Sequence, residues 1–260
     1  MMYMDFSTKT VLVTGSTTGI GLGIVNKFAS LGANVILNSF DNNPDNHELA
    51  SQIAEKYCTN AIFKKADLIY PDEARKLVTD TPDIDILVNN AGIQYVSPIE
   101  DFPSEKWNDI IAVNLSSAFH TIAEALPIMK RKGWGRIINI SSVHGLRASP
   151  YKSAYISAKH GIIGLTKTVA LETAEMPITC NAICPGYVLT PLVESQIPDQ
   201  MKVHNKDREA IIRDVMLARQ PSKEFVSEEQ IADATVFLCS ESADQITGTT
   251  LSLDGGWTSM

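Results

Sequence analysis

Seven short apolar runs alternate with amphipathic, helix-like stretches along almost the whole chain. The runs are rich in Val, Ile and Leu, and several are continuous, which is typical of strands whose two faces are both buried. Strands that alternate with helices in this way form a parallel sheet covered by helices. The sequence therefore predicts an α/β fold, with strands at residues 10–14, 34–38, 61–64, 84–89, 136–140, 178–183 and 250–253.

No linker, internal repeat or low-complexity segment divides the 260 residues. Since α/β folds of this length often form one domain, we expect residues 1–260 to form a single Rossmann-type domain, a doubly wound parallel sheet flanked by helices. Residues 192–227 are less regular, and Pro198 and Pro221 bracket a polar helical segment there. Long insertions between core elements often form lids. We expect a helical substrate lid near residues 190–227, with a solvated surface helix as the alternative.

The chain is acidic, with 22 basic and 30 acidic residues and a formal net charge of -8. A nucleic-acid binder normally carries a basic patch or stripe, so we expect no nucleic-acid partner. The first eight residues contain no long apolar run, which predicts neither a signal peptide nor a membrane span and favours a cytoplasmic protein. The four cysteines lack the paired spacing of a metal site, and we expect buried free thiols at Cys58, Cys180, Cys184 and Cys239.

A glycine-rich turn joins the first apolar run to the helix-like stretch that follows it. Gly15, Gly19 and Gly21 have the spacing GxxxGxG. Glycines let a ligand approach the backbone closely, and the free N–H groups at a helix N-terminus bind a pyrophosphate. A purely structural turn is the alternative for an isolated glycine cluster. The strand–turn–helix context favours a dinucleotide-binding site.

Tyr155 and Lys159 stand four residues apart in a helix-like stretch, so their side chains share one face. A free phenol has a pKa of about 10, and a nearby ammonium stabilises the phenolate and lowers that pKa. Ser142 follows the predicted strand 136–140 and can donate a hydrogen bond to a reacting oxygen. These three side chains predict general acid–base chemistry.

Together these motifs resemble the signature set of the short-chain dehydrogenase/reductase family, in residues 14–21, in Asn89-Asn90-Ala91-Gly92, and in Ser142, Tyr155 and Lys159. The resemblance covers essentially the whole chain. It implies a nicotinamide-dependent oxidoreductase that forms a homotetramer, and it makes Asn114 the water-holding member of a proton relay to Lys159. The cofactor contacts that it implies are Gly15, Thr17, Gly19, Ile20, Gly21, Phe40, Asp67, Leu68, Asn90, Ala91, Gly92, Tyr155, Lys159, Pro185, Gly186, Val188 and Thr190. A strand-end turn at residues 89–90 is compatible with this binding role.

The choice between NAD and NADP depends on the residues that follow the second predicted strand. Folds that prefer NAD commonly place an acidic residue there to bind the ribose hydroxyls. This chain has Asn, Ser and Phe at residues 38–40, and Asp41 follows slightly late. However, residues 15–22 and 35–43 contain no Arg or Lys, so a 2′-phosphate would lack an obvious cation. NAD is therefore the predicted cofactor.

Two residues between Ser142 and Tyr155 can donate to an anion, namely His144 and Lys152. Judged from the residues alone, a satisfied loop histidine and a solvated lysine are the alternatives. The chain also resembles the bacterial members of the family that oxidise D-3-hydroxybutyrate. That resemblance implies a substrate set in which Gln94, His144, Lys152 and Gln196 hold the carboxylate and Trp257 walls the methyl end, together with Ser142 and Tyr155. Where those relatives carry Trp, this chain has Tyr187, which keeps an aromatic wall and changes the pocket size.

The reaction implied by this resemblance converts (R)-3-hydroxybutyrate and NAD to acetoacetate, NADH and a proton, with Tyr155 as the general base. The substrate is a small anion, and no metal ion takes part. A reductase of 3-oxoacyl thioesters is the nearest alternative, although we expect it to require NADP and a basic docking surface. A dinucleotide-binding regulator without turnover is the alternative from another class, and the intact set of Ser142, Tyr155 and Lys159 disfavours it.

Overall fold

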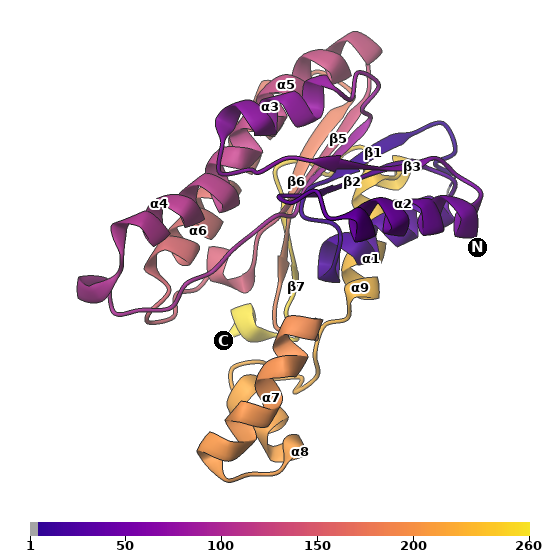
Figure 1. Cartoon of the computed structure of the whole chain (residues 1–260). Helices are drawn as coiled ribbons and strands as arrows, with labels where there is room; N and C mark the ends of the chain where they lie inside the picture. The colour runs from indigo at the N-terminus through magenta and orange to yellow at the C-terminus, as the bar shows by residue number, and fades with distance from the viewer. Residues whose placement is uncertain (1–4) are drawn as a thin grey trace.

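A parallel sheet of seven strands runs through the centre of the molecule (Figure 1). The computed structural model describes residues 5–260, with the side chains of residues 191, 192, 195, 196, 199 and 203 excepted. The strand order is β3-β2-β1-β4-β5-β6-β7. The strands are β1 (Thr10–Val13), β2 (Asn34–Ser39), β3 (Ala61–Lys65), β4 (Ile86–Asn89), β5 (Gly135–Ile140), β6 (Ile178–Pro185) and β7 (Thr250–Leu253).

All seven predicted strands are present, with small differences at their ends. β4 begins at Ile86 rather than at Ile84. Ile84 belongs to a turn in which its N–H donates to the carbonyl of Thr81, although its side chain is buried in the core. An apolar run therefore marks burial, and it does not distinguish a strand from the turn that leads into it. β6 continues past the predicted end to Pro185.

Helices connect successive strands and cover both faces of the sheet. They are α1 (Gly19–Ser30), α2 (Pro44–Tyr57), α3 (Pro71–Thr79), α4 (Ser104–Ile111), α5 (Ser117–Lys132), α6 (Ser153–Glu172), α7 (Pro191–His204), α8 (Arg208–Ala210) and α9 (Glu228–Cys239). Short 3₁₀ turns occur at η1 (Ile99–Asp101), η3 (Val143–Gly145), η5 (Glu241–Ala243) and η6 (Trp257–Ser259), and π-helical segments occur at η2 (Ala112–Ser116) and η4 (Ile211–Met216).

The strand residues divide between two buried layers, as a doubly wound sheet requires. On β1, Val11 and Val13 pack with α1, α2 and α9, whereas Leu12 packs on the other face with α3, α5 and α6. Figure 1 shows these two groups of helices on opposite sides of the sheet. The predicted Rossmann-type α/β fold is confirmed, and the reversal of strand order at β1 places a crevice at the carboxyl ends of β1 and β4.

Residues 190–227, which we call the 190–227 segment, extend beyond the sheet and carry α7, α8 and η4 (Figure 1). A small apolar cluster holds the segment together around Ile197, Ile211 and Met216. The prediction that Pro198 limits a helix is wrong, because α7 continues through it to His204. An internal proline removes one backbone hydrogen bond without necessarily ending the helix, and Pro198 is exposed.

The cysteine prediction is confirmed at three of four positions. Cys180, Cys184 and Cys239 are buried free thiols. Cys58 is exposed, because it ends α2 in a left-handed conformation at φ 53° that turns the chain back toward β3. No helix in residues 5–260 is both long and apolar enough to cross a membrane.

A chain of buried polar side chains ties α5 and α6, two helices of the same layer, to the centre of the sheet. Thr121 Oγ1 on α5 donates to Asn89 Oδ1 at 2.7 Å, and Asn89 Nδ2 donates to Asn139 Oδ1 at 2.9 Å. Asn139 Nδ2 then donates to Thr166 Oγ1 on α6 at 2.8 Å. Because each of these groups is cut off from water, each depends on the next for its hydrogen bonds.

We expect Asn139→Ala to lower the free energy of unfolding by about 2 to 4 kcal/mol, because it leaves the Asn89 amide and the Thr166 hydroxyl without their partner. Urea unfolding followed by circular dichroism measures the change. The matched control is Asn108→Ala at an exposed position on α4, which should shift stability by less than about 0.5 kcal/mol. Equal effects of the two substitutions would contradict this account.

Candidate active site

A cavity of about 570 Å³ opens at the carboxyl ends of β1, β2, β3 and β4. Ten of the predicted cofactor residues line it: Gly15, Thr17, Ile20, Phe40, Asp67, Leu68, Asn90, Ala91, Gly92 and Thr190. Sequence reasoning missed seven others, which are Thr18, Asn38, Ser39, Ala66, Ile69, Ile93 and Val113. Among the residues that the structure describes, Asp67 is the one charged residue of the lining. The cavity has the size and position of a dinucleotide-binding cleft.

The glycine turn is built by close backbone contacts. Gly15 and Gly19 have φ near +58° and +57°, where a side chain would strain the backbone. A Cβ on Gly21 would lie 2.5 Å from the Gly15 carbonyl oxygen and 2.6 Å from Asn90 Nδ2. Asn90 Nδ2 itself donates to the carbonyls of Thr14 and Gly15. Asn90 is therefore the strand-end brace that the sequence left open as a possibility.

Gly19 and Gly21 thus shape the cleft without lining it. The first turn of α1 contains no acidic residue, so its free N–H groups keep their partial positive charge for a pyrophosphate. These features fit a dinucleotide.

Asn38 lies near the end of β2, where folds that prefer NAD commonly carry an acidic residue that binds the ribose. Its amide serves the protein itself: Oδ1 accepts from the N–H of Gly15, and Nδ2 donates to the carbonyls of Lys64 and Ala66. Asp41, three residues further along the chain, accepts from Ser39 Oγ at 3.1 Å. The carboxylate of Asp41 is thereby held beside a residue that lines the cleft.

Ser142, Tyr155 and Lys159 meet where β5 ends and α6 begins. The phenol of Tyr155 forms a hydrogen bond with Ser142. Lys159 Nζ lies 5.6 Å from the centre of the Tyr155 ring and donates to the carbonyl of Ile140 at 2.7 Å. The structure therefore brings the three predicted acid–base residues together.

Burial has the largest effect on the pKa values of Tyr155 and Lys159. It raises the pKa of Tyr155, and the hydrogen bond from Ser142 opposes that rise only in part. It lowers the pKa of Lys159 to about 8. The predicted downward shift of the Tyr155 pKa is wrong for this structure, because desolvation of the phenolate outweighs the attraction of an ammonium at this distance.

Asn114 lies in the π-helical segment η2 and is buried, not exposed. Its Oδ1 accepts from the N–H of Ile93 at 2.8 Å, and its Nδ2 donates to the Ile93 carbonyl at 3.0 Å. These bonds hold the loop that follows β4. One N–H of the Asn114 amide and one lone pair of its oxygen remain for the predicted water.

Three of the predicted substrate residues form an aromatic cluster beside Tyr155. The rings of Tyr187 and Trp257 stack with their centres 5.8 Å apart and their planes 19° apart. His144 packs edge-on against Trp257 at 5.6 Å and against Tyr155 at 6.1 Å. The aromatic wall predicted for Tyr187 and Trp257 is present, and His144 closes the side next to Ser142.

Two cations stand at the same pocket. Lys152 precedes α6, and burial together with the charge of Arg219 lowers its pKa. Burial and the nearby charges also lower the pKa of His144 to about 4, so this ring is neutral at pH 7. Arg219 was missed by sequence analysis. Its place in the 190–227 segment, 70 residues from Ser149 to which it donates, left no local signal.

The remaining predicted contacts are only partly placed by the structure. Gln94 is exposed on the loop after β4, and this loop bonds to the residue before Lys152 through Ser97 N–H and the Tyr151 carbonyl. The side chain of Gln196, on α7, lies outside the described residues. Pro185 and Gly186 end β6 without lining the cleft.

Val188 is packed into the core, so the structure does not place it in the nucleotide cleft. Its backbone pairs with Val226 in an isolated bridge. This pairing turns the side chain inward, which the motif position alone does not indicate.

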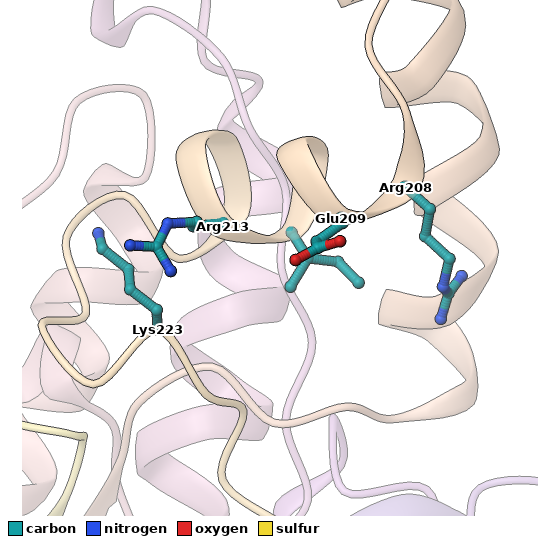
Figure 2. Close-up of a pocket in the computed structure, with 5 residues that line it drawn as sticks. Arg208, Glu209, Arg213 and Lys223 are labelled. Atoms are coloured by element: carbon teal, nitrogen blue, oxygen red, sulfur yellow. The ribbon is translucent and has the colours of Figure 1, made fainter.

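A second hollow, on the 190–227 segment, is lined by Arg208, Glu209, Ile212, Arg213 and Lys223 (Figure 2). Two of its three cations bind other groups of the protein. Arg208 forms an ion pair with Glu194, and Lys223 Nζ donates to two backbone carbonyls. Figure 2 shows Arg208 directed away from Arg213. The described residues contain no group of three His, Cys, Asp or Glu side chains arranged to hold a metal ion.

A crevice for a dinucleotide beside a serine, tyrosine and lysine defines a nucleotide-dependent oxidoreductase. The family model for short chain dehydrogenase matches residues 9–201, and the chain belongs to this family. The match contains both the glycine turn and the segment from Ser142 to Lys159, on which the sequence-based resemblance depends.

Two relatives share about half of the sequence over nearly the full length. D-beta-hydroxybutyrate dehydrogenase of Rhizobium meliloti is 54% identical over 96% of this chain and 99% of its own. The enzyme of the same name from Cupriavidus necator is 51% identical over 96% of this chain and 97% of its own. Among solved structures, L-sorbose reductase of Gluconobacter frateurii, complexed with NADPH and L-sorbose, is 31% identical with a TM-score of 0.92 over 98% of both chains.

We expect Gly21→Ala to weaken binding of the reduced dinucleotide about tenfold or more, because its Cβ would displace the Gly15 carbonyl and the Asn90 amide. Quenching of intrinsic fluorescence on titration with NADH measures the Kd. Gly23→Ala on the same helix is the control, since its Cβ would meet Glu228 alone, 3.1 Å from Cβ and 3.5 Å from the carbonyl oxygen, away from Gly15 and Asn90. The same Kd for both variants would remove Gly21 from the architecture of the cleft.

Proposed function

We propose that this chain catalyses the reversible oxidation of (R)-3-hydroxybutyrate to acetoacetate with NAD. The observation that carries the proposal is the convergence of Tyr155 and Ser142 with an aromatic wall and a cation at the end of β5, the strand next to β4 of the dinucleotide cleft. The two relatives named D-beta-hydroxybutyrate dehydrogenase support the substrate, since their similarity extends over nearly the whole chain.

The acid–base residues divide the chemical step among them. Bound NAD would supply the hydride acceptor, C4 of the nicotinamide. Tyr155 accepts the proton of the substrate hydroxyl once Lys159 and the positive charge that bound NAD would bring offset the rise of its pKa on burial. Ser142 donates a hydrogen bond to the same oxygen. Lys159, with its pKa of about 8, is mainly protonated at pH 7 and stabilises the phenolate. In the proposed relay, Asn114 holds the water that returns the proton to solvent.

The charges at the pocket favour a small anion over a neutral alcohol. Lys152 is partly desolvated and is repelled by Arg219. A carboxylate placed beside Lys152 offsets both effects, whereas a neutral substrate leaves the cation without a partner. In this pose Gln94 and Gln196 supply neutral donors, and the methyl end of the substrate meets Trp257 and Tyr187. The two ring nitrogens of His144 already face Ser142 and Ser149, so this ring closes the pocket instead of donating to the carboxylate.

NAD is proposed because the cleft offers nothing to neutralise a 2′-phosphate. The lining residues that the structure describes include no Arg or Lys, and Asp41 stands beside Ser39 where it can accept from ribose hydroxyls and repels a phosphate. The solved relative from Gluconobacter frateurii binds NADPH, so the fold accommodates a 2′-phosphate in that relative, and the side chains at this rim select the dinucleotide.

A 3-oxoacyl thioester reductase remains the alternative substrate assignment. Relatives named 3-oxoacyl-[acyl-carrier-protein] reductase reach 32% to 33% identity, well below the 54% of the hydroxybutyrate enzyme. The closed aromatic wall of Tyr187 and Trp257 also suits a four-carbon acid better than a long thioester arm.

We further propose a cytoplasmic homotetramer. Large apolar side chains on helices next to the site are exposed, including Phe119 on α5 and Leu171 on α6, which are 51% and 79% exposed. Such side chains are available to pack against further copies of the chain, where they would form part of a contiguous apolar patch. Sedimentation equilibrium should give four times the 28.4 kDa chain mass.

The purified chain should reduce NAD in the presence of (R)-3-hydroxybutyrate and not in the presence of the S enantiomer. With NADP, kcat/KM should be at least about tenfold lower, because the 2′-phosphate meets no cation. Absorbance of the reduced nicotinamide measures both rates. Absence of turnover with the R enantiomer would overturn the substrate assignment, and turnover with a 3-oxoacyl thioester instead would establish the alternative.

We expect Lys152→Ala to raise the KM for 3-hydroxybutyrate about 10- to 100-fold with kcat largely kept, because the variant loses a charge-assisted hydrogen bond to the carboxylate. Tyr155→Phe should instead reduce kcat by at least about 100-fold, because the proton acceptor is gone. The methyl ester of 3-hydroxybutyrate is the control, since it lacks the charge. An unchanged KM for the acid in Lys152→Ala would contradict the role of Lys152.

A further inference from the structure

A continuous series of hydrogen-bonding atoms runs from the 190–227 segment to the reacting centre. Arg219 Nη1 donates to Ser149 Oγ at 3.1 Å. Ser149 Oγ lies 3.0 Å from His144 Nε2, and His144 Nδ1 lies 3.5 Å from Ser142 Oγ. Ser142 Oγ also accepts the backbone N–H of His144 at 3.1 Å. The direction in which these atoms donate determines where the Ser142 proton points.

The direction is set at the arginine end. A guanidinium has donors only, so Ser149 Oγ must accept from Arg219. A hydroxyl that accepts from a cation becomes a stronger donor of its own proton, and His144 Nε2 is the acceptor within reach. The His144 ring is neutral, because burial and neighbouring charges lower its pKa to about 4. A neutral imidazole that accepts at Nε2 carries its proton on Nδ1.

The Nδ1 proton then decides the state of Ser142. Ser142 Oγ has two lone pairs and one proton. The backbone N–H of His144 occupies one lone pair, and the Nδ1–H of the same residue occupies the other. The hydroxyl proton is left for Tyr155 or for the substrate oxygen. In the other tautomer Ser142 would donate to Nδ1, and the reacting oxygen would lose that donor.

We infer that Arg219, acting through Ser149, holds His144 in the Nδ1–H tautomer and so keeps the Ser142 proton available to the reacting oxygen. Arg219 is a positioning residue, since it acts through Ser149 and His144. The inference rests on the proposed function, in which Ser142 donates to the substrate oxygen. It gives the 190–227 segment a part in the chemistry.

Nitrogen NMR of histidine side chains tests the tautomer without substrate or cofactor. The nitrogen shifts of 15N-histidine-labelled protein distinguish Nδ1–H from Nε2–H, and loss of a signal in His144→Gln identifies His144. The wild-type chain should show Nδ1–H. Ser149→Ala, which keeps the arginine charge, and Arg219→Gln should both increase the Nε2–H share. Arg213→Gln, an exposed arginine of the same segment (Figure 2), should leave the signal unchanged.

Steady-state kinetics of the same variants test the consequence for catalysis. Ser149→Ala and Arg219→Gln should each lower kcat about tenfold, less than the loss of a whole oxyanion donor, with KM within about twofold of wild type. Arg213→Gln should keep both constants.

Three results would overturn the inference: an Nε2–H tautomer in the wild-type chain, a His144 spectrum unchanged in both relay variants, or a rise in KM alone for Arg219→Gln. The last would mean that Arg219 binds the carboxylate directly. If no variant and no wild-type protein oxidised 3-hydroxybutyrate, the proposed function would fail, while the NMR result would still decide the tautomer.

Discussion

Burial of both faces of a parallel sheet is the constraint on which the rest of this structure depends. Because β1 and its neighbours present aliphatic side chains to both sides, helices cover both, and only the strand ends stay accessible. At β1 the strand order reverses, so the chain continues from β1 and from β4 to helices on opposite faces of the sheet. Gly15, Asn90 and Ser142 each follow one of the central strands. The topology therefore places the dinucleotide cleft and the proton-transfer residues on the same edge of the sheet. Which substrate binds there depends on the surrounding side chains.

At that edge of the sheet, desolvation shifts the pKa values of the ionisable side chains more than ion pairing does. Burial lowers the pKa of Lys159 to about 8 and that of His144 to about 4. Lys152 is shifted the same way, and Arg219 repels it. A pocket that holds partly desolvated cations is electrostatically incomplete, and an entering carboxylate supplies the missing charge. The same desolvation keeps His144 neutral, which lets it orient protons instead of binding the anion as a second cation.

The sequence predicts the seven strands well because a doubly buried strand leaves an unmistakable aliphatic run, and it predicts the glycine turn and Tyr155 because their chemistry depends on local spacing. The features that the sequence does not predict depend on contacts between residues that are far apart in the chain. Arg219 reaches Ser149 across 70 residues, and the Asn38 amide is used up by backbone groups of the adjacent turn and strand. The sign of the Tyr155 pKa shift depends on burial, which a four-residue spacing does not reveal.

The close approach of the two loops at the crevice has a consequence for how the cleft binds and releases its ligand. Thr14 Oγ1 accepts from the N–H groups of both Asn90 and Ala91, and a Cβ on Gly15 would lie 2.9 Å from the Ala91 Cα. The two loops are therefore locked to each other as one rigid floor. Such a preorganised floor loses little conformational entropy when a dinucleotide settles on it. The freedom needed for entry and departure must come from the opposite wall, where Thr190 leads into α7.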